Sequence, residues 1–543
     1  MQKYFQKIPR TAWILIVIVL VGFSFRIYRH HDYLRFNPDQ ARDASLIGDV
    51  ADGKIGWPLL GPQAGGTDFR LGGAFYQIEI ASAKIFGSAP DRLAFPDLFF
   101  SILSIVLLHF FLREFFDENI ALLSSGIFAV SFYAVKYARF AWNPNSTPFY
   151  VLLFLYAILQ LTKNKGKREW LWALAIGVAA GIGVQLHSLL LFSMPIVFVF
   201  YFGYLFFKKN PAWKWAPFIL LVGIALNASQ IVSEMQTGGK NTQAFFQGMH
   251  AKSSRKGNPL AKFILDTTCH VQVNSFMLLP LGNDSQCDFI NAPANLSKKS
   301  DGLFVKVILA ADIIFAVVFS VGGYWLLFKH WRAEKDESKK RFLEVAILYA
   351  GTLFVLLIPL AAEISFRFFL VLEFMPCLLL AFWLKYITEC SALRGPVETR
   401  HCLVSTGVTV TVAVIAIINI FYITRNFAYL AGQTKEGSNG FEEITLGEVQ
   451  YMAKFIETHS GNAKNIYLQG KAGDLFEMTK PIQYFTNRAG LDVNNFKKNM
   501  PLAPEDKVFS ITVVKNPQSK NEAPRNALAS GQFNRIRIYA VGE

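Results

Sequence analysis

Residues 36–43 read Phe-Asn-Pro-Asp-Gln-Ala-Arg-Asp, and they come shortly after the first long apolar stretch of the chain, residues 12–29. Nearly all other long apolar stretches come later in the sequence. A run of about 18 or more apolar residues is long enough to cross the hydrocarbon core of a bilayer. This order predicts that the chain crosses a membrane once, places charged groups at the far water interface, and then builds the rest of its membrane body.

The composition also predicts a membrane protein. The chain has 543 residues, of which 52% are hydrophobic and 51 are phenylalanine, and its mean hydropathy is +0.31. Together with the run lengths, these values indicate an α-helical polytopic membrane protein with about eleven transmembrane helices. We expect the spans at residues 12–29, 95–112, 119–135, 147–162, 170–187, 189–207, 216–233, 303–328, 342–362, 368–388 and 402–424.

The net charge of +15 is explained by membrane topology, so no nucleic-acid partner is predicted. Cytoplasmic loops carry an excess of Lys and Arg. The basic clusters before the first span and at residues 163–168, 208–214 and 329–341 share one side if the N-terminus is cytoplasmic. Residues 30–94, 234–302 and 425–543 then lie on the opposite, extracytoplasmic side.

This topology divides the chain into a transmembrane domain, residues 1–425, and a soluble extracytoplasmic α/β domain, residues 426–543. In the first outer loop, Asn37 and Pro38 indicate a helix start, since Asn is a good N-cap and Pro suits the first turn. The outer loop 234–302 is polar and has little periodicity. In the tail we expect helices at residues 446–459 and 478–487 and strands at residues 465–469, 508–514 and 535–541.

The cysteine and histidine pattern predicts no metal centre and no other cofactor. No CxxC motif and no His/Cys spacing typical of a metal site occurs in the sequence. Cys269 and Cys287 share the outer loop 234–302, where an oxidising compartment favours a disulfide. Two free thiols are the alternative.

Asp39 is the first candidate for catalysis. On a helix that begins at Pro38, it shares a face with Arg42 and Asp43. A carboxylate within hydrogen-bond reach of an attacking hydroxyl can take up its proton as a general base. The alternative is an aspartate that complements the helix macrodipole.

Further candidates for substrate binding lie near other span ends. Arg42 and Arg139 carry the forked donors that suit phosphate, although arginines at span ends also snorkel to lipid headgroups. Trp142 and Asn143 belong to a run of aromatic and amide residues that suits a sugar, and equally an interfacial aromatic belt.

His187 and Arg367 lie at the outer membrane edge. A lone histidine such as His187 is more often structural than a metal ligand. Arg367 either pairs with Glu363 or serves a substrate, since ionisable groups at membrane depth are functional candidates by default.

With these residues laid out, the sequence of the first 425 residues resembles the GT-C superfamily of polyprenyl-phosphate-sugar-dependent glycosyltransferases. Protein mannosyltransferases that use dolichyl-phosphate mannose, and the lipid A aminoarabinose transferase, are similar in pattern. The family motif Asp-Glu-x-Arg matches Asp39-Gln40-Ala41-Arg42 at Asp and Arg, with Gln40 in the place of Glu. An aromatic, basic patch before a late span is similar to residues 365–370.

Two other family motifs are changed in this chain. A His-Pro-Pro-Leu-Tyr-like stretch corresponds to residues 69–76, which read Phe-Arg-Leu-Gly-Gly-Ala-Phe-Tyr. An Asp-Pro pair at the fourth span corresponds to Asn143-Pro144, where an amide cannot carry a negative charge.

The resemblance implies an inverting transferase that uses a polyprenyl-phosphate sugar as donor and a lipid, glycan or protein as acceptor. It implies Asp39 as the base, Arg42 and Arg139 near the phosphate, and Arg367 as a further candidate. We also predict Asp43, Trp142, Asn143 and His187 as substrate-binding residues. It also implies the inner (plasma) membrane, with the site outside the cytoplasm. The alternatives are a transporter or flippase for a lipid-linked glycan and a non-catalytic lipid-sugar binder.

Overall fold

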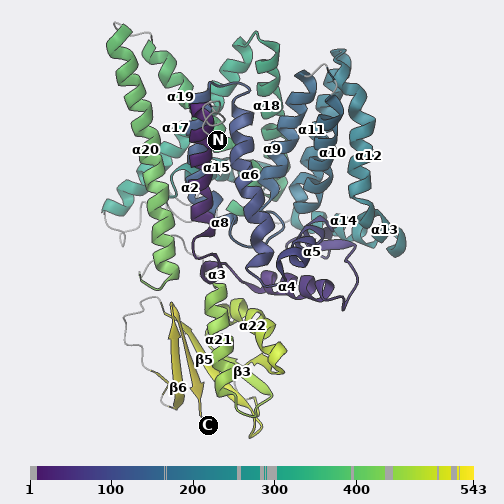
Figure 1. Ribbon diagram of the computed structural model, residues 1–543, viewed down its shortest axis with the longest axis vertical. Coiled ribbons are helices and arrows are strands. Elements are labelled where there is room, and N and C mark those ends of the chain that lie inside the picture. Colours follow the sequence, from purple (N-terminus) through teal and green to yellow (C-terminus); the bar gives the residue numbers. More distant parts are fainter. Residues whose placement is uncertain are drawn as a thin grey trace, which may run out of the picture.

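The computed structural model shows a helical membrane body with a smaller α/β domain below it (Figure 1). It describes residues 9–163, 166, 168–253, 258–281, 287, 289, 303–392, 397–433, 444–497, 500–514, 523–524 and 526–542. The first half of the body contains α2 (Arg10–Ile27), α3 (His30–Tyr33), α4 (Pro38–Ala51), α5 (Ala74–Phe86), η1 (Arg92–Ala94), α6 (Phe95–Leu112), α7 (Glu118–Val130), α8 (Phe132–Tyr137), α9 (Thr147–Lys163), α10 (Glu169–Leu186) and α11 (Ser188–Phe207).

The second half of the body contains η2 (Pro211–Trp215), α12 (Ala216–Leu226), α13 (Ala228–Thr237), α14 (Lys240–Ser253), α15 (Pro259–Leu278), α17 (Leu303–Ala333), α18 (Glu337–Leu357), η4 (Ile358–Glu363), η5 (Phe366–Leu372), α19 (Met375–Ala392) and α20 (Val397–Leu430). A short hairpin of β1 (Leu60–Gln63) and β2 (Arg70–Gly72) joins α4 to α5.

The described helices make this a multi-pass membrane protein. Seven of them are long and apolar enough to cross a bilayer, and two bent helix pairs raise that number to nine. The shorter apolar helices α7 and α9 account for the remaining two predicted stretches. All eleven predicted stretches therefore fall on helices, although not every one is a straight span.

Three of the predicted spans are interrupted by polar contacts or by proline. The stretch 119–135 breaks at Ser131, whose hydroxyl donates to the carbonyl oxygen of Met277 at 2.9 Å. The stretch 216–233 bends by 61° at Asn227, whose amide donates to the carbonyl oxygen of Gly181 at 3.0 Å. The stretch 368–388 bends by 61° before α19, where Pro376 suits the first turn of a new helix.

The described part of the outer loop 234–302 is more helical than its sequence predicts. It contains α14 and α15, and α15 is buried over most of its second half. Polar residues such as Asp266, His270 and Asn274 face the interior there, which hides the helix from a search for apolar periodicity. Cys269 and Cys287 form a disulfide with a Cα–Cα distance of 4.9 Å, as the favoured alternative predicts.

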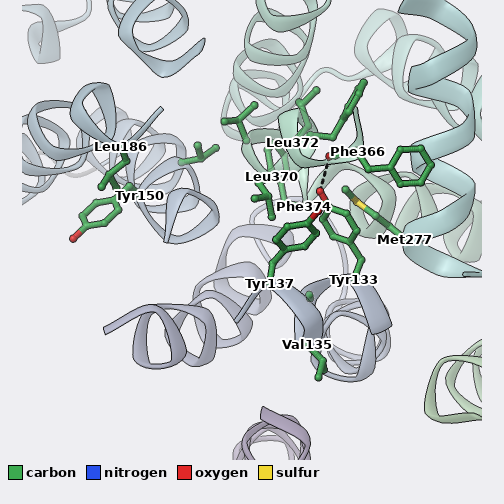
Figure 2. Packing of buried hydrophobic residues seen from close by; sticks show 14 of the residues in the cluster. Tyr133, Val135, Tyr137, Tyr150, Leu186, Met277, Phe366, Leu370, Leu372 and Phe374 are labelled. Atoms are coloured by element: carbon green, nitrogen blue, oxygen red, sulfur yellow. Dashed lines mark hydrogen bonds between the residues drawn. The ribbon is translucent and has the colours of Figure 1, made fainter. Parts of the chain in front are cut away.

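Aromatic packing fills the centre of the body. Figure 2 shows Tyr133 and Tyr137 next to Phe366 and Leu370. The hydroxyl of Tyr133 donates to the carbonyl oxygen of Phe366 at 2.6 Å, which satisfies the one polar atom of this buried ring. Helix α8 is thereby fixed against η5, and both segments border the site described below.

The C-terminal domain is a five-stranded sheet in the order β4-β3-β5-β7-β6, with β3, β4 and β5 parallel and β6 and β7 antiparallel. Its elements are α21 (Leu446–His459), β3 (Asn465–Gln469), α22 (Ala472–Thr486), η6 (Asn487–Ala489), β4 (Asp492–Asn495), β5 (Lys507–Val513), β6 (Ala527–Phe533) and β7 (Ile536–Val541). The two predicted helices and three predicted strands are confirmed, although α22 begins earlier than expected. The sequence pattern does not predict strands β4 and β6; β4 is short and polar, and none of the residues of β6 is buried.

The C-terminal domain joins the membrane body through main-chain hydrogen bonds. Phe36 N–H donates to the carbonyl oxygen of Ile444 at 2.9 Å, and Leu446 N–H donates to that of Leu34 at 2.7 Å. Next to this bridge α22 packs along α4, with Phe36 against the ring of Tyr484. The first loop after α2 thus lies between the membrane body and the domain (Figure 1).

Candidate active site

The first turn of α4 presents Asp39 at the end of the body that carries the C-terminal domain. Asn37 and Gln40 form a capping box in which the side-chain oxygen of Gln40 accepts from Asn37 N–H at 3.2 Å. Pro38 occupies the first helical position, as predicted. Asp39 therefore sits at the positive end of the helix dipole, and its side chain is 58% exposed.

Arg42 bridges two carboxylates that lie in very different surroundings. Its Nη1 donates to Oδ1 of Asp39 at 2.8 Å. Its Nε and Nη2 both reach Oδ1 of Asp43 at 2.9 Å, and this second carboxylate is only 2% exposed. Burial alone would lower the pKa of Arg42, but the charges of Asp43 and Asp39 outweigh burial and raise it. The guanidinium therefore stays charged.

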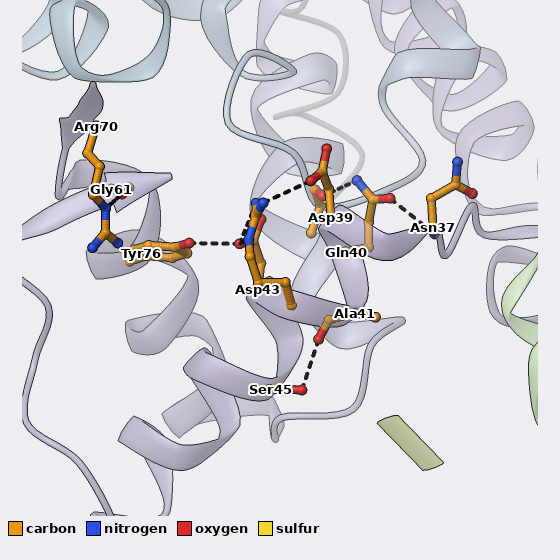
Figure 3. A network of polar contacts seen from close by, with 11 residues as sticks. Asn37, Asp39, Gln40, Ala41, Asp43, Ser45, Gly61, Arg70 and Tyr76 are labelled. Atoms are coloured by element: carbon orange, nitrogen blue, oxygen red, sulfur yellow. Dashed lines mark hydrogen bonds and ion pairs between the residues drawn. The ribbon is translucent and has the colours of Figure 1, made fainter. Parts of the chain in front are cut away.

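Tyr76 of α5 also belongs to this network of polar contacts. Its hydroxyl donates to Oδ1 of Asp43 at 2.7 Å, and Figure 3 shows the two side chains in line with Asp39. Burial and the neighbouring carboxylate raise the pKa of Tyr76 well above its usual value, so the phenol remains a donor. The sequence analysis missed Tyr76 as a site residue, although it is the tyrosine retained in the altered stretch 69–76.

A second wall of the site comes from the loop between α8 and α9. Gln40 Nε2 donates to the carbonyl oxygen of Ala141 at 3.4 Å, which ties α4 to this loop. Trp142 N–H donates to Oδ2 of the buried Asp97 at 2.9 Å. The amide of Asn143 donates to the carbonyl oxygen of Leu186 at 2.7 Å, next to the start of α11.

His187 and Arg367 meet at this second wall. The guanidinium of Arg367 lies 6.0 Å from the ring centre of Trp142 and 5.6 Å from that of Phe368. The ring of His187 meets the same Phe368 edge-on at 5.9 Å. Four of the predicted residues, Trp142, Asn143, His187 and Arg367, are thus brought together.

The protonation of His187 follows from its contacts. Its Nδ1 accepts a hydrogen bond from Leu189 N–H at 3.1 Å, so the neutral ring carries its proton on Nε2. Burial and the charge of Arg367 lower the pKa of His187 to about 4. At neutral pH the positive charge of this wall therefore belongs to Arg367, whose side chain is exposed.

Arg139 is placed away from these residues. It is 5% exposed, and its Nη1 donates to the carbonyl oxygens of Phe25 and Arg26 at 2.9 Å. Its Nη2 donates to that of Tyr28 at 2.8 Å, and the guanidinium also covers the ring of Phe427. These carbonyls at the end of α2 lack helical partners, so Arg139 caps that helix.

An apolar pocket opens beside Arg367. It encloses about 480 Å³ of space, part of which is open solvent, and is lined by the β1–β2 hairpin, the start of α11, α14, η4 and η5. Phe368 belongs both to this pocket and to the surroundings of Arg367. The cationic Arg367 thus neighbours this apolar pocket through Phe368.

Two further acidic side chains are buried near the site. Glu79 of α5 and Asp97 of α6 are each 1% exposed, and neither oxygen of Glu79 has a partner among the described residues. Burial raises the pKa of Glu79 well above its usual value, and the charges of Asp97 and Asp43 add to the effect. Within the part of the chain that the structure describes, no three His, Cys, Asp or Glu side chains are grouped to hold a metal ion.

The comparisons with known proteins agree with this architecture. The sequence profile of the dolichyl-phosphate-mannose-protein mannosyltransferase family matches residues 74–232. No curated protein sequence matches the chain.

Solved structures give a broader match. ArnT from Cupriavidus metallidurans bound to undecaprenyl phosphate is 12% identical, with a TM-score of 0.52 and coverage of 98% of both chains. The archaeal oligosaccharyltransferase AglB from Archaeoglobus fulgidus, in complex with an inhibitory peptide and a dolichol-phosphate, is 13% identical, with a TM-score of 0.51. That match covers 91% of this chain but only 64% of AglB. The chain therefore has the GT-C fold of these structures, and its residues 74–232 are similar to the dolichyl-phosphate-mannose protein mannosyltransferases.

Proposed function

We propose that this protein is a membrane glycosyltransferase that moves a sugar from a polyprenyl-phosphate donor to an acceptor outside the cytoplasm. The observation that carries the proposal is Asp39, an exposed carboxylate whose position is fixed at one oxygen by Arg42. The GT-C fold supports the reaction class. The related structures are described with undecaprenyl phosphate and dolichol-phosphate bound, which supports a lipid-phosphate donor.

In the proposed reaction Asp39 is the general base. The acceptor hydroxyl oxygen attacks C1 of the sugar from the face opposite the phosphate, and its proton passes to Asp39. The bond between C1 and the phosphate oxygen breaks, and its electron pair leaves with the polyprenyl phosphate. The configuration at C1 is therefore inverted. The protein contributes positioning and base catalysis.

Arg367 is proposed to bind the donor phosphate. Its guanidinium is exposed and can offer two parallel N–H groups to phosphate oxygens. The apolar pocket that shares Phe368 would take the first isoprene units. His187 offers a neutral Nε2–H donor, and Trp142 offers a ring face to the sugar. Arg139 is not part of this proposal, because its guanidinium already serves three carbonyl groups.

The end of the body that carries the C-terminal domain is proposed to face the outside of the inner (plasma) membrane. The opposite end carries the basic loops, where Lys163 pairs with Glu114 and Arg341 donates to the carbonyl oxygen of Thr162. The Cys269–Cys287 disulfide also suits an oxidising compartment. Labelling of introduced single cysteines from outside intact cells tests this orientation. A cysteine placed at residue 52 should react with the label, and one placed at residue 335 should not.

The central experiment measures release of polyprenyl phosphate from a panel of polyprenyl-phosphate sugars by purified protein, with membrane extract as acceptor. We expect release by the wild type and a loss of at least about a hundredfold in Asp39→Asn, the scale of general base catalysis. Asp49→Asn is the matched control, because Asp49 lies on the same helix, is exposed and pairs with Lys54. The product should show an inverted anomeric configuration by NMR.

The donor site has its own test. Removing a charged hydrogen-bond partner costs about 1.5–3 kcal/mol, or about 10–100-fold in affinity. Arg367→Gln should therefore raise KM for the donor by that factor, whereas Arg29→Gln at the same membrane end should not.

Equal release by wild type and Asp39→Asn would remove Asp39 from the mechanism. Donor binding without release in any condition would favour a non-catalytic lipid-sugar binder.

A further inference from the structure

Arg42 is shared between Asp39 and Asp43, and the sharing is unequal. Two of its nitrogens, Nε and Nη2, contact Oδ1 of Asp43, whereas only Nη1 reaches Asp39. Asp43, which receives two contacts, is buried, whereas Asp39, which receives one, is 58% exposed. Among the described residues, Oδ2 of Asp39 receives no hydrogen bond and remains open to solvent.

Asp43 is itself held from a second element. The hydroxyl of Tyr76 donates to the same Oδ1 that accepts from Arg42, so this carboxylate is fixed between α4 and α5 (Figure 3). Its other oxygen, Oδ2, is buried and has no partner among the described residues. Asp43 thus has no open oxygen with which to meet a large sugar substrate, although its sequence position next to the candidate base predicts substrate binding.

We propose that Asp43 is a positioning residue, which acts by turning the guanidinium of Arg42 so that a single N–H contacts the base. This inference rests on the proposed function, in which Asp39 accepts the proton of the acceptor. If Asp43 did not hold two of the nitrogens, the guanidinium could meet Asp39 with two parallel hydrogen bonds. Both oxygens of Asp39 would then be occupied, and the charged carboxylate would be stabilised.

The consequence is a change in the basicity of Asp39. A carboxylate that is more strongly stabilised in its charged form has a lower pKa and accepts a proton less readily. Loss of the negative charge of Asp43 acts in the same direction, since a nearby like charge raises the pKa of a carboxylate. Asp43→Asn should therefore shift the acid limb of the pH–rate profile to lower pH by about one unit.

Other charged groups face this network and must stay unchanged in the test. The charges of Asp97 and Asp43 act on Glu79, and the charge of Arg70 acts on Tyr76 from the β2 strand. Glu477 of α22 and Arg35 interact electrostatically on the side of Asp39. Arg488 reaches the far end of α4 near Gly48.

The experiment is the pH dependence of kcat/KM for release of polyprenyl phosphate between pH 4.5 and 8.5. The variants are Asp43→Asn, Tyr76→Phe and the control Asp49→Asn. We expect the acid limb to move to lower pH only in Asp43→Asn, with a fall in rate near neutral pH. Tyr76→Phe keeps every charge of the network, so it should lower the rate and leave the limb in place.

A double-mutant cycle shows whether Asp43 acts through Arg42. Arg42→Gln removes the cation and should move the limb to higher pH by about one unit. In that background the effect of Asp43→Asn should shrink to less than half of its value in the wild type. An unmoved limb in a folded Asp43→Asn protein, or an undiminished effect in the Arg42→Gln background, would overturn the inference. If Asp43→Asn does not fold, an acid limb that stays in place in Arg42→Gln would overturn the inference.

The failure of this inference can be told apart from the failure of the proposed function. Release that is abolished in Asp39→Asn but shows no limb shift in Asp43→Asn contradicts only the positioning role. Equal release in wild type and Asp39→Asn contradicts the base itself, and with it the inference. The apparent melting temperature of each purified variant, compared with Asp49→Asn, separates both results from misfolding.

Discussion

Arg139 donates from Nη2 to the carbonyl oxygen of Tyr28 at 2.8 Å, across 111 residues of sequence and just past the end of α2. Arg139→Gln would leave three carbonyls at this helix end without this donor, and the loss at the buried carbonyl of Arg26 should cost about 1–3 kcal/mol. We expect a marked fall in the apparent melting temperature and an unchanged KM for the donor in the folded fraction. Arg139→Lys should also lose stability, because an ammonium lacks the planar fork.

Arg367→Gln supplies the contrast for this prediction. Its guanidinium is exposed and contacts two rings, so the variant should melt at the temperature of the wild type while its donor KM rises. If instead Arg139→Gln raised the donor KM without loss of stability, Arg139 would belong to the phosphate site.

Gln40 holds α4 at two points, and its amide cannot be replaced by a carboxylate without loss. Its oxygen accepts from Asn37 N–H and its Nε2 donates to the carbonyl oxygen of Ala141. Gln40→Glu keeps the first bond but places a carboxylate oxygen opposite the buried carbonyl oxygen of Ala141. The two acceptors cannot form a hydrogen bond, which should destabilise the fold by about 1–3 kcal/mol. The apparent melting temperature measures the effect. Gln63→Glu is the control, because Gln63 is exposed, and an equal loss in both variants would contradict the prediction.

Release of polyprenyl phosphate should be insensitive to chelators. Arg42 occupies Oδ1 of Asp39 with a cationic donor, which opposes binding of a divalent cation at that oxygen. The neighbouring amides of Gln40 and Asn143 use their nitrogens as donors to carbonyls and carry no charge. We expect activity after EDTA treatment and dialysis to stay within about twofold of the untreated protein. A larger loss that Mg²⁺ or Mn²⁺ restores would show that the site recruits a metal.

The stability of the protein should fall in mild acid because of His30. Burial and the charge of Arg139 lower the pKa of His30 from 6.5 to about 4. The unfolded chain then binds a proton at a higher pH than the folded chain, so stability is complete above about pH 6.5 and declines towards pH 4. The loss from this one residue is about 2 kcal/mol at pH 5.

The measurement for this prediction is the apparent melting temperature between pH 8 and pH 4.5. His30→Asn should flatten its decline, whereas His31→Asn, at an exposed neighbouring position, should not. A decline of the same slope in His30→Asn and wild type would show that other groups cause the acid sensitivity.

Much of the membrane body could be predicted from the sequence because long apolar runs have few alternatives to a helix. The start of α4 could also be predicted, since Asn37 and Pro38 act locally. The buried polar helix α15 could not, because its burial depends on distant parts of the chain, as in the bond from Ser275 to Asp312. Its apolar content is therefore a poor guide to its burial.

The candidate site shows the same division between local and distant information. The contact of Arg42 with Asp39 lies within one helical turn and follows from spacing alone. The bond between Tyr76 and Asp43, and the three carbonyls around Arg139, join residues that are 33 to 114 positions apart. Arginines at membrane edges have similar sequence surroundings, so only the distances show which one is exposed and which one caps a helix.

The main-chain bridge between Leu34–Phe36 and Ile444–Leu446 has a consequence for biosynthesis. Helix α22, which packs along α4, comes much later in the chain, at Ala472–Thr486. Domains generally fold in the order in which they are synthesised, yet α4 cannot reach its final surroundings until α22 has been synthesised. The contacts that hold the helix of Asp39 are therefore completed late in translation, and chains that stop before α22 would lack them.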